Sequence, residues 1–418
     1  MGGGIMDIYH IRNGRSLMVT GWHTSFPPSS CLGPDSGELN WRAVVSEAEQ
    51  MVGYPTSFLN LRWLFNDEIA VAATQLRKLV GTNHPLLKSA KNILVGSKSN
   101  LQSVGLVVLL VSKAAGFGPD QLVEQHSSGV LNAQRALAEI VEMKRTGHII
   151  HKAMANLRDR RASGGQYEDL LCGNKIVLLS GDYLLAKCLK HLGDLRNNEV
   201  TELISTGLRD LVEGDFFGEI DADGNPLPSK PKASNTIERN YDWENENNLG
   251  KLGSNDFLGQ GKDEWKLRTM LTSGSLLAKG CQAAMMLSKQ GMEMEREAYR
   301  LGGHLAMIWQ LYLDVKDFFT HPHSYSLVGA PVIIAIWEYP TVYGHIFEAK
   351  LEKRGVDFKQ LFYAVRSTRA LEYLRLLLHE ELMAVVRCTE RFPVEDARLA
   401  LNKMAASIHS EAVQFLDS

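Results

Sequence analysis

The chain contains the stretch GNKIVLLSGDYLLA at residues 173–186. Its apolar residues recur every three or four positions, and this spacing continues from Lys175 to Leu192, which predicts a long helix with an apolar face. A second stretch with the same spacing, LLAKGCQAA, spans residues 276–284. Both stretches predict helices that pack against other helices.

The same periodicity predicts helices over most of the chain. Alternation of apolar and polar residues bounded by hairpin turns, which is typical of strands, is absent from the sequence. We therefore expect an all-α fold, a helical bundle with a central cavity, and bundles build their sites from facing helices. The predicted helices are Trp41–Val52, Asn60–Leu79, Leu122–Lys152, Lys175–Leu192, Val200–Gly214, Glu264–Lys289, Glu293–Phe319, Phe358–Thr389 and Val394–Leu416.

Two segments of the chain differ from the predicted helices in composition. Residues 1–37 are rich in Gly, Ser and Pro, and we interpret them as a flexible N-terminal segment or a weak transit peptide. Residues 219–261 are dense in Asn, Asp, Gly, Pro and Ser and hold few large apolar side chains, which predicts a mobile insertion between helices. The length of 418 residues allows one large domain or two smaller ones.

Charge and composition exclude some functions. A net charge of -3 and the lack of a basic patch interleaved with aromatic residues argue against nucleic acid as a partner. The five cysteines are scattered without metal-site spacing, which suits a reducing compartment. The longest apolar runs, residues 104–111 and 327–337, are too short to cross about 30 Å of hydrocarbon.

The stretch WQLYLDVKDF, residues 309–318, carries two carboxylates at helical spacing. Asp314 and Asp317 lie three residues apart, so they share one face of a helix, and Gln310 lies one turn before Asp314. Carboxylates placed in this way can bind Mg²⁺. The alternative interpretation is a solvated helix face with Lys316 between the two acids.

These stretches, together spanning about residues 45 to 400, resemble the trans-prenyl diphosphate synthases. In that family, residues 173–186 correspond to the helix after a first DDxxD metal motif, and residues 309–318 correspond to the second. Leu313 replaces the first aspartate of the second motif, which leaves Gln310, Asp314 and Asp317. The first motif is degenerate, because its three aspartate positions hold Lys152, Ala153 and Asn156.

The groups that hold diphosphate in the family are eroded as well. The signature GGKRxRP appears here as VGSKSNLQ at residues 95–102, in which only Lys98 is retained, and a lysine-threonine pair appears as Thr272-Ser273. Lys98 and Lys175 remain as candidate diphosphate contacts. Metal-holding anions and phosphate-holding cations are therefore reduced in number together, while the helix-packing segments are intact.

This pattern is similar to the non-catalytic second subunits of heteromeric trans-polyprenyl (decaprenyl or solanesyl) diphosphate synthases. The resemblance implies an isoprenoid-synthase-type bundle over residues 38–418 as a single domain, with no catalytic residues of its own. It also implies a heterotetramer with a catalytic subunit that holds Mg²⁺ and builds the polyprenyl tail of ubiquinone from isopentenyl diphosphate and an allylic diphosphate. The implied location is the mitochondrial matrix, and peripheral association with the inner membrane stays open.

Two other hypotheses compete with a non-catalytic subunit. The chain is alternatively a self-sufficient prenyltransferase that uses the reduced metal set of Asp314 and Asp317, or a scaffold that kept the fold without prenyl chemistry. By resemblance, we expect the runs Gln125–Leu131 and Gln134–Ile150 at the partner interface. The alternative for the second run is an internal core helix.

Overall fold

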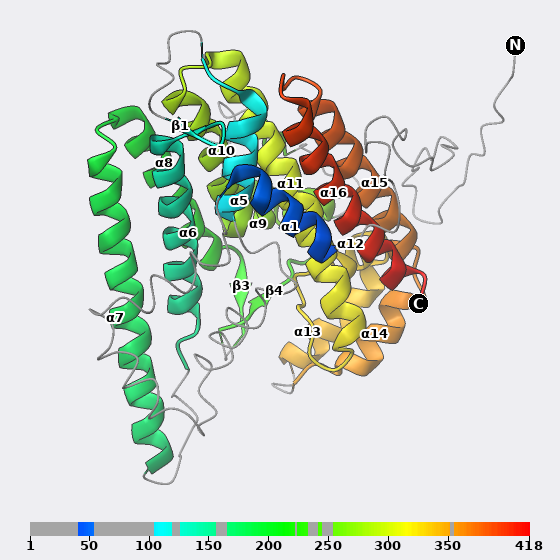
Figure 1. Cartoon of the computed structure of the whole chain (residues 1–418). Coiled ribbons are helices and arrows are strands. Elements are labelled where there is room, and N and C mark those ends of the chain that lie inside the picture. The colour runs from blue at the N-terminus through cyan, green and yellow to red at the C-terminus, as the bar shows by residue number, and fades with distance from the viewer. Residues whose placement is uncertain are drawn as a thin grey trace, which may run out of the picture.

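The computed structural model describes residues 41–53, 104–118, 126–155, 165–221, 224–232, 241–244, 254–351 and 355–418. These residues form a helical bundle, which confirms the predicted all-α fold (Figure 1). The helices are α1 (Trp41–Val52), α5 (Val104–Ala115), α6 (Asn132–Lys152), α7 (Gly165–Asp194), α8 (Asn198–Asp215), α9 (Lys262–Thr269), α10 (Ser275–Leu287), α11 (Met292–Thr320), α12 (Ala330–Glu338), α13 (Tyr343–Leu351), α14 (Phe358–Arg366), α15 (Ala370–Thr389) and α16 (Glu395–Leu416). Two short antiparallel pairs join β1 (His126–Ser127) to β2 (Val130–Leu131) and β3 (Glu219–Ile220) to β4 (Pro226–Leu227).

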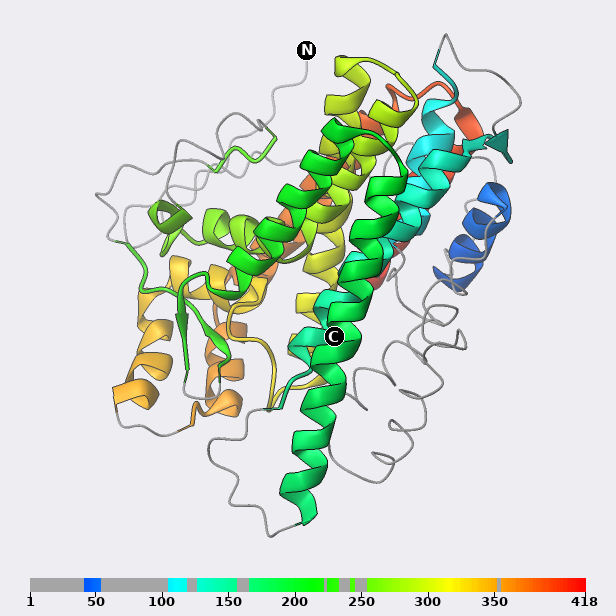
Figure 2. The same cartoon turned by 90° about the vertical axis from the view of Figure 1, so that its left-hand side faces the viewer.

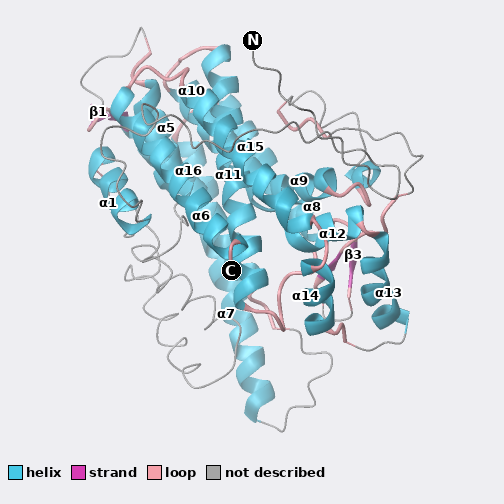
Figure 3. Cartoon of the chain, turned by 90° about the vertical axis from the view of Figure 1, so that its right-hand side faces the viewer, coloured by secondary structure: helices cyan, strands magenta, loops and turns pink. Residues whose placement is uncertain are grey.

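The core is organised around α11. This helix packs against α10, α15 and α16 and is buried along most of its length (Figures 1 and 3). A Cβ atom at Gly302 would lie 2.8 Å from the Cα atom of Ala278, so the glycine lets α10 and α11 approach closely. Among the described helices, none combines the length and the apolar character needed to cross a bilayer.

The stretch at residues 173–186 lies in α7, which packs along α6 (Figure 2). A Cβ atom at Gly181 would lie 2.1 Å from Nε2 of His151, so only glycine leaves room for that ring. A Cβ atom at Gly147 would lie 3.4 Å from the carbonyl oxygen of Gly181. Small residues therefore set the close crossing of these two helices, and Val177 and Leu184 fill the remaining contact with apolar side chains.

Two segments predicted as single helices contain breaks that are not helical. The segment predicted as one helix from Leu122 to Lys152 contains a hairpin before α6, with Ser128 and Gly129 at φ of 53° and 78° in its turn. The segment predicted as one helix from Phe358 to Thr389 is divided at residues 367–369 into α14 and α15. The predicted helix Asn60–Leu79 lies outside the described residues.

The described parts of the insertion at 219–261 are anchored on the bundle. The side chain of Trp243 is 2% exposed and lies edge-on to the ring of His304, with 4.8 Å between ring centroids. A Cβ atom at Gly303 would lie 2.1 Å from the Trp243 ring, so the glycine provides the space that this ring fills. Arg268 of α9 donates hydrogen bonds to the carbonyl oxygens of Phe217 and Leu227 on either side of β3. Composition did not indicate these anchors, and mobility of the remaining parts stays a prediction.

Candidate functional site

The carboxylate of Asp314 joins three helices. Its Oδ2 atom accepts hydrogen bonds from Trp265 Nε1 of α9 and from the backbone N–H of Ala330, the first residue of α12, both at 2.8 Å. Its Oδ1 atom accepts a hydrogen bond from Gln310 Nε2 at 2.7 Å. The N-terminus of a helix is a favourable place for an anion, because its first N–H groups have no partner within the helix. Asp314 therefore acts as a structural acceptor.

Burial controls the ionisation of Asp314. Its side chain lies in the core, and burial raises its pKa to about 6, although the Ala330, Trp265 and Gln310 donors oppose this shift. A carboxylate that is desolvated and already shared by three donors is a poor ligand for Mg²⁺, which requires near-ideal octahedral geometry.

Asp317 is placed differently, one turn further along α11. Its side chain is 41% exposed and accepts a hydrogen bond from the Ser326 N–H at 3.0 Å. Its other oxygen lies 3.2 Å from Nδ1 of His321. Leu313, at the position of the missing aspartate, packs against the hydrophobic core. The three predicted residues of this motif thus lie together on α11, and the two acids hold the segment that leads into α12.

The first motif lies at the C-terminal end of α6. Lys152 is half exposed, and its Nζ atom lies 2.7 Å from Oδ1 of Asp215 at the end of α8. The other carboxylate oxygen of Asp215 lies 3.6 Å from His148 Nε2. A cation occupies the first aspartate position and is paired with an acid of the same chain, so the arrangement repels a metal ion. Sequence reasoning missed Asp215, whose only local signal is its place in the Gly214-Asp215 pair that ends a helix.

The other predicted positions contribute little to a site. Ala153 is 4% exposed and packs with apolar residues of α6 and α7. Lys175 lies exposed on α7. Asn156 and Lys98 lie outside the described residues. The residues of the two motifs contact different helices: Lys152 of the first motif contacts α8, and Asp314 of the second contacts α9 and α12.

A buried ion pair lies between α8 and α10. The Nζ atom of Lys279 lies 2.5 Å from Oδ2 of Asp210, which also accepts a hydrogen bond from the Ser275 hydroxyl. Burial opposes the ionisation of Asp210, but Lys279 and these hydrogen bonds hold its pKa below the usual range. Thr272 and Ser273, at the expected lysine-threonine position, lie in a single π-helical turn, Met270–Gly274, just before α10. No local pattern in the sequence indicates this pair, because its members are 69 residues apart.

The apolar side chains of α6, on which the expected partner interface rests, lie inside this chain. Leu137, Ile140 and Val141 are fully buried within this chain, and α6 packs against α5, α7 and α10. Leu131, at the start of the helix, is also buried. The apolar face of α6 is therefore part of the core of this chain, as in the alternative that the periodicity left open, and the position of the partner interface stays a prediction.

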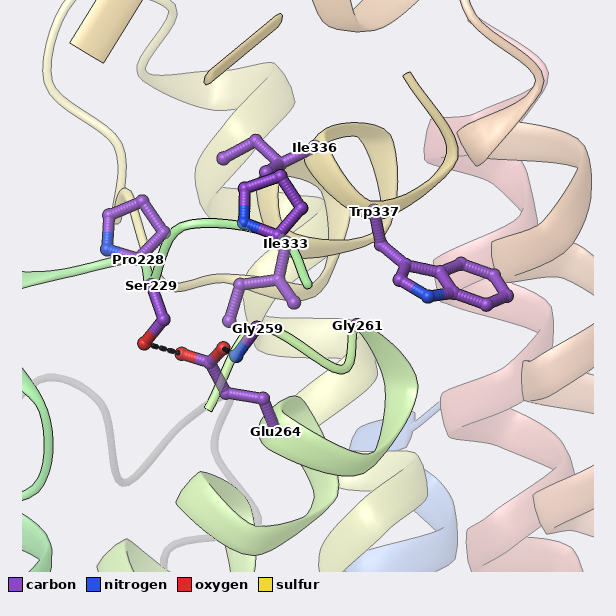
Figure 4. Close-up of a pocket in the computed structure, with 9 residues that line it drawn as sticks. Pro228, Ser229, Gly259, Gly261, Glu264, Ile333, Ile336 and Trp337 are labelled. Carbon is purple, nitrogen blue, oxygen red and sulfur yellow. Dashed lines mark hydrogen bonds between the residues drawn. The ribbon is translucent and has the colours of Figure 1, made fainter. Parts of the chain in front are cut away.

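A small pocket lies where the insertion meets α12 (Figure 4). Ile333, Ile336 and Trp337 form its apolar side, and the space that the centre of a water molecule can reach is about 10 Å³. Glu264 at its edge accepts hydrogen bonds from the Ser229 hydroxyl and the Gly259 N–H, at 3.0 and 2.6 Å. Because its carboxylate also pairs with Arg268, Glu264 holds the insertion in place, and the pocket has room for about one water molecule.

Mg²⁺ does not fit the residues of either motif. In the part of the chain that the structure describes, no group of three or more His, Cys, Asp or Glu side chains is arranged to hold a metal ion. The first motif offers Lys152 and the buried Ala153. The second offers Asp314, whose carboxylate already accepts hydrogen bonds from N–H donors, and Asp317, whose carboxylate accepts one from a backbone N–H.

Comparison with known proteins identifies similar sequences. No family model matches the chain. The chain is 35% identical over 410 residues to the human all-trans-polyprenyl-diphosphate synthase PDSS2, an alignment that covers 93% of each protein. It is 36% identical over 387 residues to the mouse protein of the same name, covering 88% of this chain and 87% of that protein. The mitochondrial hexaprenyl pyrophosphate synthase of Saccharomyces cerevisiae is 28% identical over 316 residues, covering 70% of this chain and 66% of that protein.

Solved structures share the fold. The polyprenyl synthase of Caulobacter crescentus, solved with calcium and isoprenyl diphosphate, aligns with a TM-score of 0.57 at 16% identity and covers 90% of this chain and 99% of that one. The heptaprenyl diphosphate synthase of Staphylococcus aureus aligns with a TM-score of 0.56 at 16% identity and the same coverage. The bundle is therefore that of a polyprenyl synthase, with the two metal motifs altered as described.

Proposed function

The chain belongs to the all-trans-polyprenyl-diphosphate synthase family, and from this premise we propose that it is the non-catalytic subunit of a heteromeric synthase. The complex is a transferase that adds isopentenyl diphosphate units to an allylic diphosphate. Its product is the all-trans polyprenyl chain that becomes the side chain of ubiquinone. This chain alone is inactive.

The proposal depends on one observation, that neither metal motif of this chain presents carboxylates that are free to bind Mg²⁺. Ionisation of an allylic diphosphate needs Mg²⁺ ions that neutralise the leaving group as its negative charge grows. Here Asp314 is held by three N–H donors, and Lys152 stands where the first motif would supply a carboxylate. A chain without either metal site has no means to stabilise the departing diphosphate.

The partner therefore supplies the chemistry. We assign Mg²⁺ to a catalytic subunit of the same family with two complete DDxxD motifs, and we propose a heterotetramer of two copies of each chain. The mitochondrial relatives in yeasts and other fungi support a mitochondrial location, which we place in the matrix. The long lipid product supports peripheral contact of the complex with the inner membrane.

The test compares this chain alone, the catalytic subunit alone and both together. Each preparation is incubated with radiolabelled isopentenyl diphosphate, farnesyl diphosphate and Mg²⁺, and the products are separated by chain length. We expect no elongation by this chain alone and full activity from the co-expressed pair. Sustained turnover by the pure chain would instead support a self-sufficient prenyltransferase, and full activity of the catalytic subunit without this chain would support a scaffold.

A further inference from the structure

Three charged side chains are buried where α6, α8 and α10 meet. Lys144 of α6, Asp210 of α8 and Lys279 of α10 are 2%, 7% and 4% exposed. The three helices contact one another (Figure 1), and the charges of Asp210 and Lys279 both act on Lys144, so the three side chains form one charged layer inside the bundle. Lysine and aspartate are rarely buried to this extent unless they are paired. The charged layer therefore needs an explanation beyond the packing of helices.

The members of the charged layer differ in how their charge is compensated. Lys279 pairs with Asp210, which also accepts a hydrogen bond from the Ser275 hydroxyl. Lys144 instead donates to the backbone carbonyl of Ile204 on α8, which is a neutral group. Burial lowers the pKa of Lys144 to about 8, so removing this amine from water has a cost that its surroundings do not fully offset.

The charged layer lies two turns behind the altered first motif. Lys152, at the motif, pairs with Asp215 of α8, and Asp215 also lies 3.6 Å from His148, one turn further back on α6. Lys144 lies one more turn back, about 12 Å from Lys152 along the axis, given a rise of about 1.5 Å per residue. There it contacts α8 again, through Ile204. Polar contacts therefore join α6 and α8 from the motif to the charged layer.

A polyprenyl chain needs the opposite surroundings, because it is a hydrocarbon. A chain whose diphosphate lay at the motif end of α6, and which extended into the bundle along that helix, would reach the charged layer after two turns. It would then replace the polar neighbours of Lys144, Asp210 and Lys279 by hydrocarbon. Charged groups that are buried without compensation in this way are strongly unfavourable. The charged layer thus opposes the entry of a prenyl chain.

We propose that Lys144, Asp210 and Lys279 keep the prenyl chain out of this bundle and so confine it to the catalytic subunit. This inference rests on the proposed function, which supplies the substrate and the partner. It adds to that function the residues that decide which of two related bundles takes the hydrocarbon. The altered metal motifs explain why this chain does not ionise an allylic diphosphate, whereas the charged layer explains why it does not hold the prenyl chain.

The experiment removes the charges and measures binding of a prenyl chain. The triple variant combines Lys144→Met, Asp210→Leu and Lys279→Met, and because both members of the ion pair are replaced together, neither is left buried alone. The control variant, Thr389→Val with Asn402→Leu, removes a buried hydrogen bond of 2.8 Å between α15 and α16 instead. Each full-length chain, alone and in complex with the catalytic subunit, is irradiated with a photoreactive farnesol analogue. Farnesol is chosen because the altered motifs offer no metal to hold a diphosphate.

The label in each subunit is measured after separation, and labelled peptides are identified by mass spectrometry. In the wild-type complex we expect the label on the catalytic subunit. We expect the triple variant to take up at least about tenfold more label than the wild-type chain, in peptides of α6, α8 or α10, because the charges no longer oppose the hydrocarbon. Unlabelled farnesol should compete for this labelling, and the control variant should behave like the wild type.

Three results would overturn the proposed role of the charged layer. They are labelling of the wild-type chain in these peptides as strong as that of the catalytic subunit, a triple variant that keeps its helicity and melting temperature but gains no label, and an equal gain in the control variant. If the triple variant does not fold, Lys144→Met alone replaces it, with a smaller gain expected and the same conclusion from no gain. None of these results affects the proposed function, whereas elongation by the isolated wild-type chain would overturn both.

Discussion

Replacing Asp314 by alanine should destabilise the protein, although this position corresponds to a metal ligand in the family. The substitution leaves the indole N–H of Trp265 and the backbone N–H of Ala330 without their shared acceptor. Both residues are buried, at 1% and 0% exposure. An unsatisfied buried donor costs about 1–3 kcal/mol, so two of them cost about 2–6 kcal/mol. Removal of a costly buried carboxylate offsets part of this, and we expect a loss of about 3 kcal/mol.

Asparagine at the same position separates hydrogen bonding from charge. Its carbonyl oxygen can accept from both Trp265 and Ala330, and its NH₂ group faces Gln310, whose own amide can turn to present oxygen. We therefore expect Asp314→Asn to cost no more than about 1 kcal/mol near neutral pH. Asp317→Ala, at a half-exposed acid that accepts one backbone N–H, is the matched control and should cost about 1 kcal/mol.

The pH dependence gives a second, independent readout. Burial raises the pKa of Asp314 to about 6. The unfolded value is about 3.9, so the folded protein binds this proton more tightly. The stability that protonation adds is fully present below about pH 4 and is lost as the pH rises through about 6. The stability of the wild type relative to Asp314→Asn should therefore fall by up to about 3 kcal/mol over this range.

Urea unfolding of the wild type and the three variants, followed by circular dichroism between pH 4 and 7.5, measures these differences. The same series with and without Mg²⁺ tests the role of the carboxylate directly. The reasoning is refuted if Asp314→Ala is as stable as the wild type. It is equally refuted if Mg²⁺ stabilises the wild type and not Asp314→Asn, because the carboxylate would then hold a metal.

Two further predictions concern the first motif and the insertion. Restoring acids at Lys152, Ala153 and Asn156 together should not make the isolated chain active, because the diphosphate-binding cations of the family stay absent at residues 99–102 and at Thr272, and the acid at position 153 would be buried. Polyprenyl diphosphate made by this variant alone would contradict the account. Trp243→Ala and Gly303→Ala should both detach the insertion from the bundle: the first lowers the free energy of unfolding by about 3–5 kcal/mol through lost packing, and the second fills the space of the Trp243 ring. Unchanged resistance to limited proteolysis at residues 219–261 would argue against this anchor.

Helix periodicity was a good guide to the fold where local signals define a boundary. The predicted helix Trp41–Val52 has the bounds of α1, and the prediction Glu293–Phe319 falls within one residue of α11 at each end. The break between α14 and α15 has no glycine or proline to mark it, so periodicity alone passed over it. The turn at Ser128-Gly129 does carry a turn signal, which the apolar spacing on both sides outweighed.

The roles of the candidate site residues depended on contacts that no local pattern reveals. Substitutions at the aspartate positions can be read from the sequence, but the use of Asp314 as an acceptor depends on Trp265, 49 residues earlier. Lys152 finds Asp215 through the packing of α6 and α8. The composition of a segment is an average over its residues, so it does not indicate that a single side chain, Trp243, anchors the insertion in the space beside Gly303.

The hydrogen bond from Ala330 to Asp314 also bears on how a chain like this one evolves. When an acid that no longer binds a metal serves instead as the acceptor at the N-terminus of α12, as Asp314 does, selection for a stable fold opposes its substitution. A mutation that freed the carboxylate for a metal would loosen α9 and α12 at once, while a gain in catalysis would still need several other substitutions. The fold depends on Asp314 as a hydrogen-bond acceptor, so under the proposed function any change that returns this carboxylate to metal binding passes through a less stable protein.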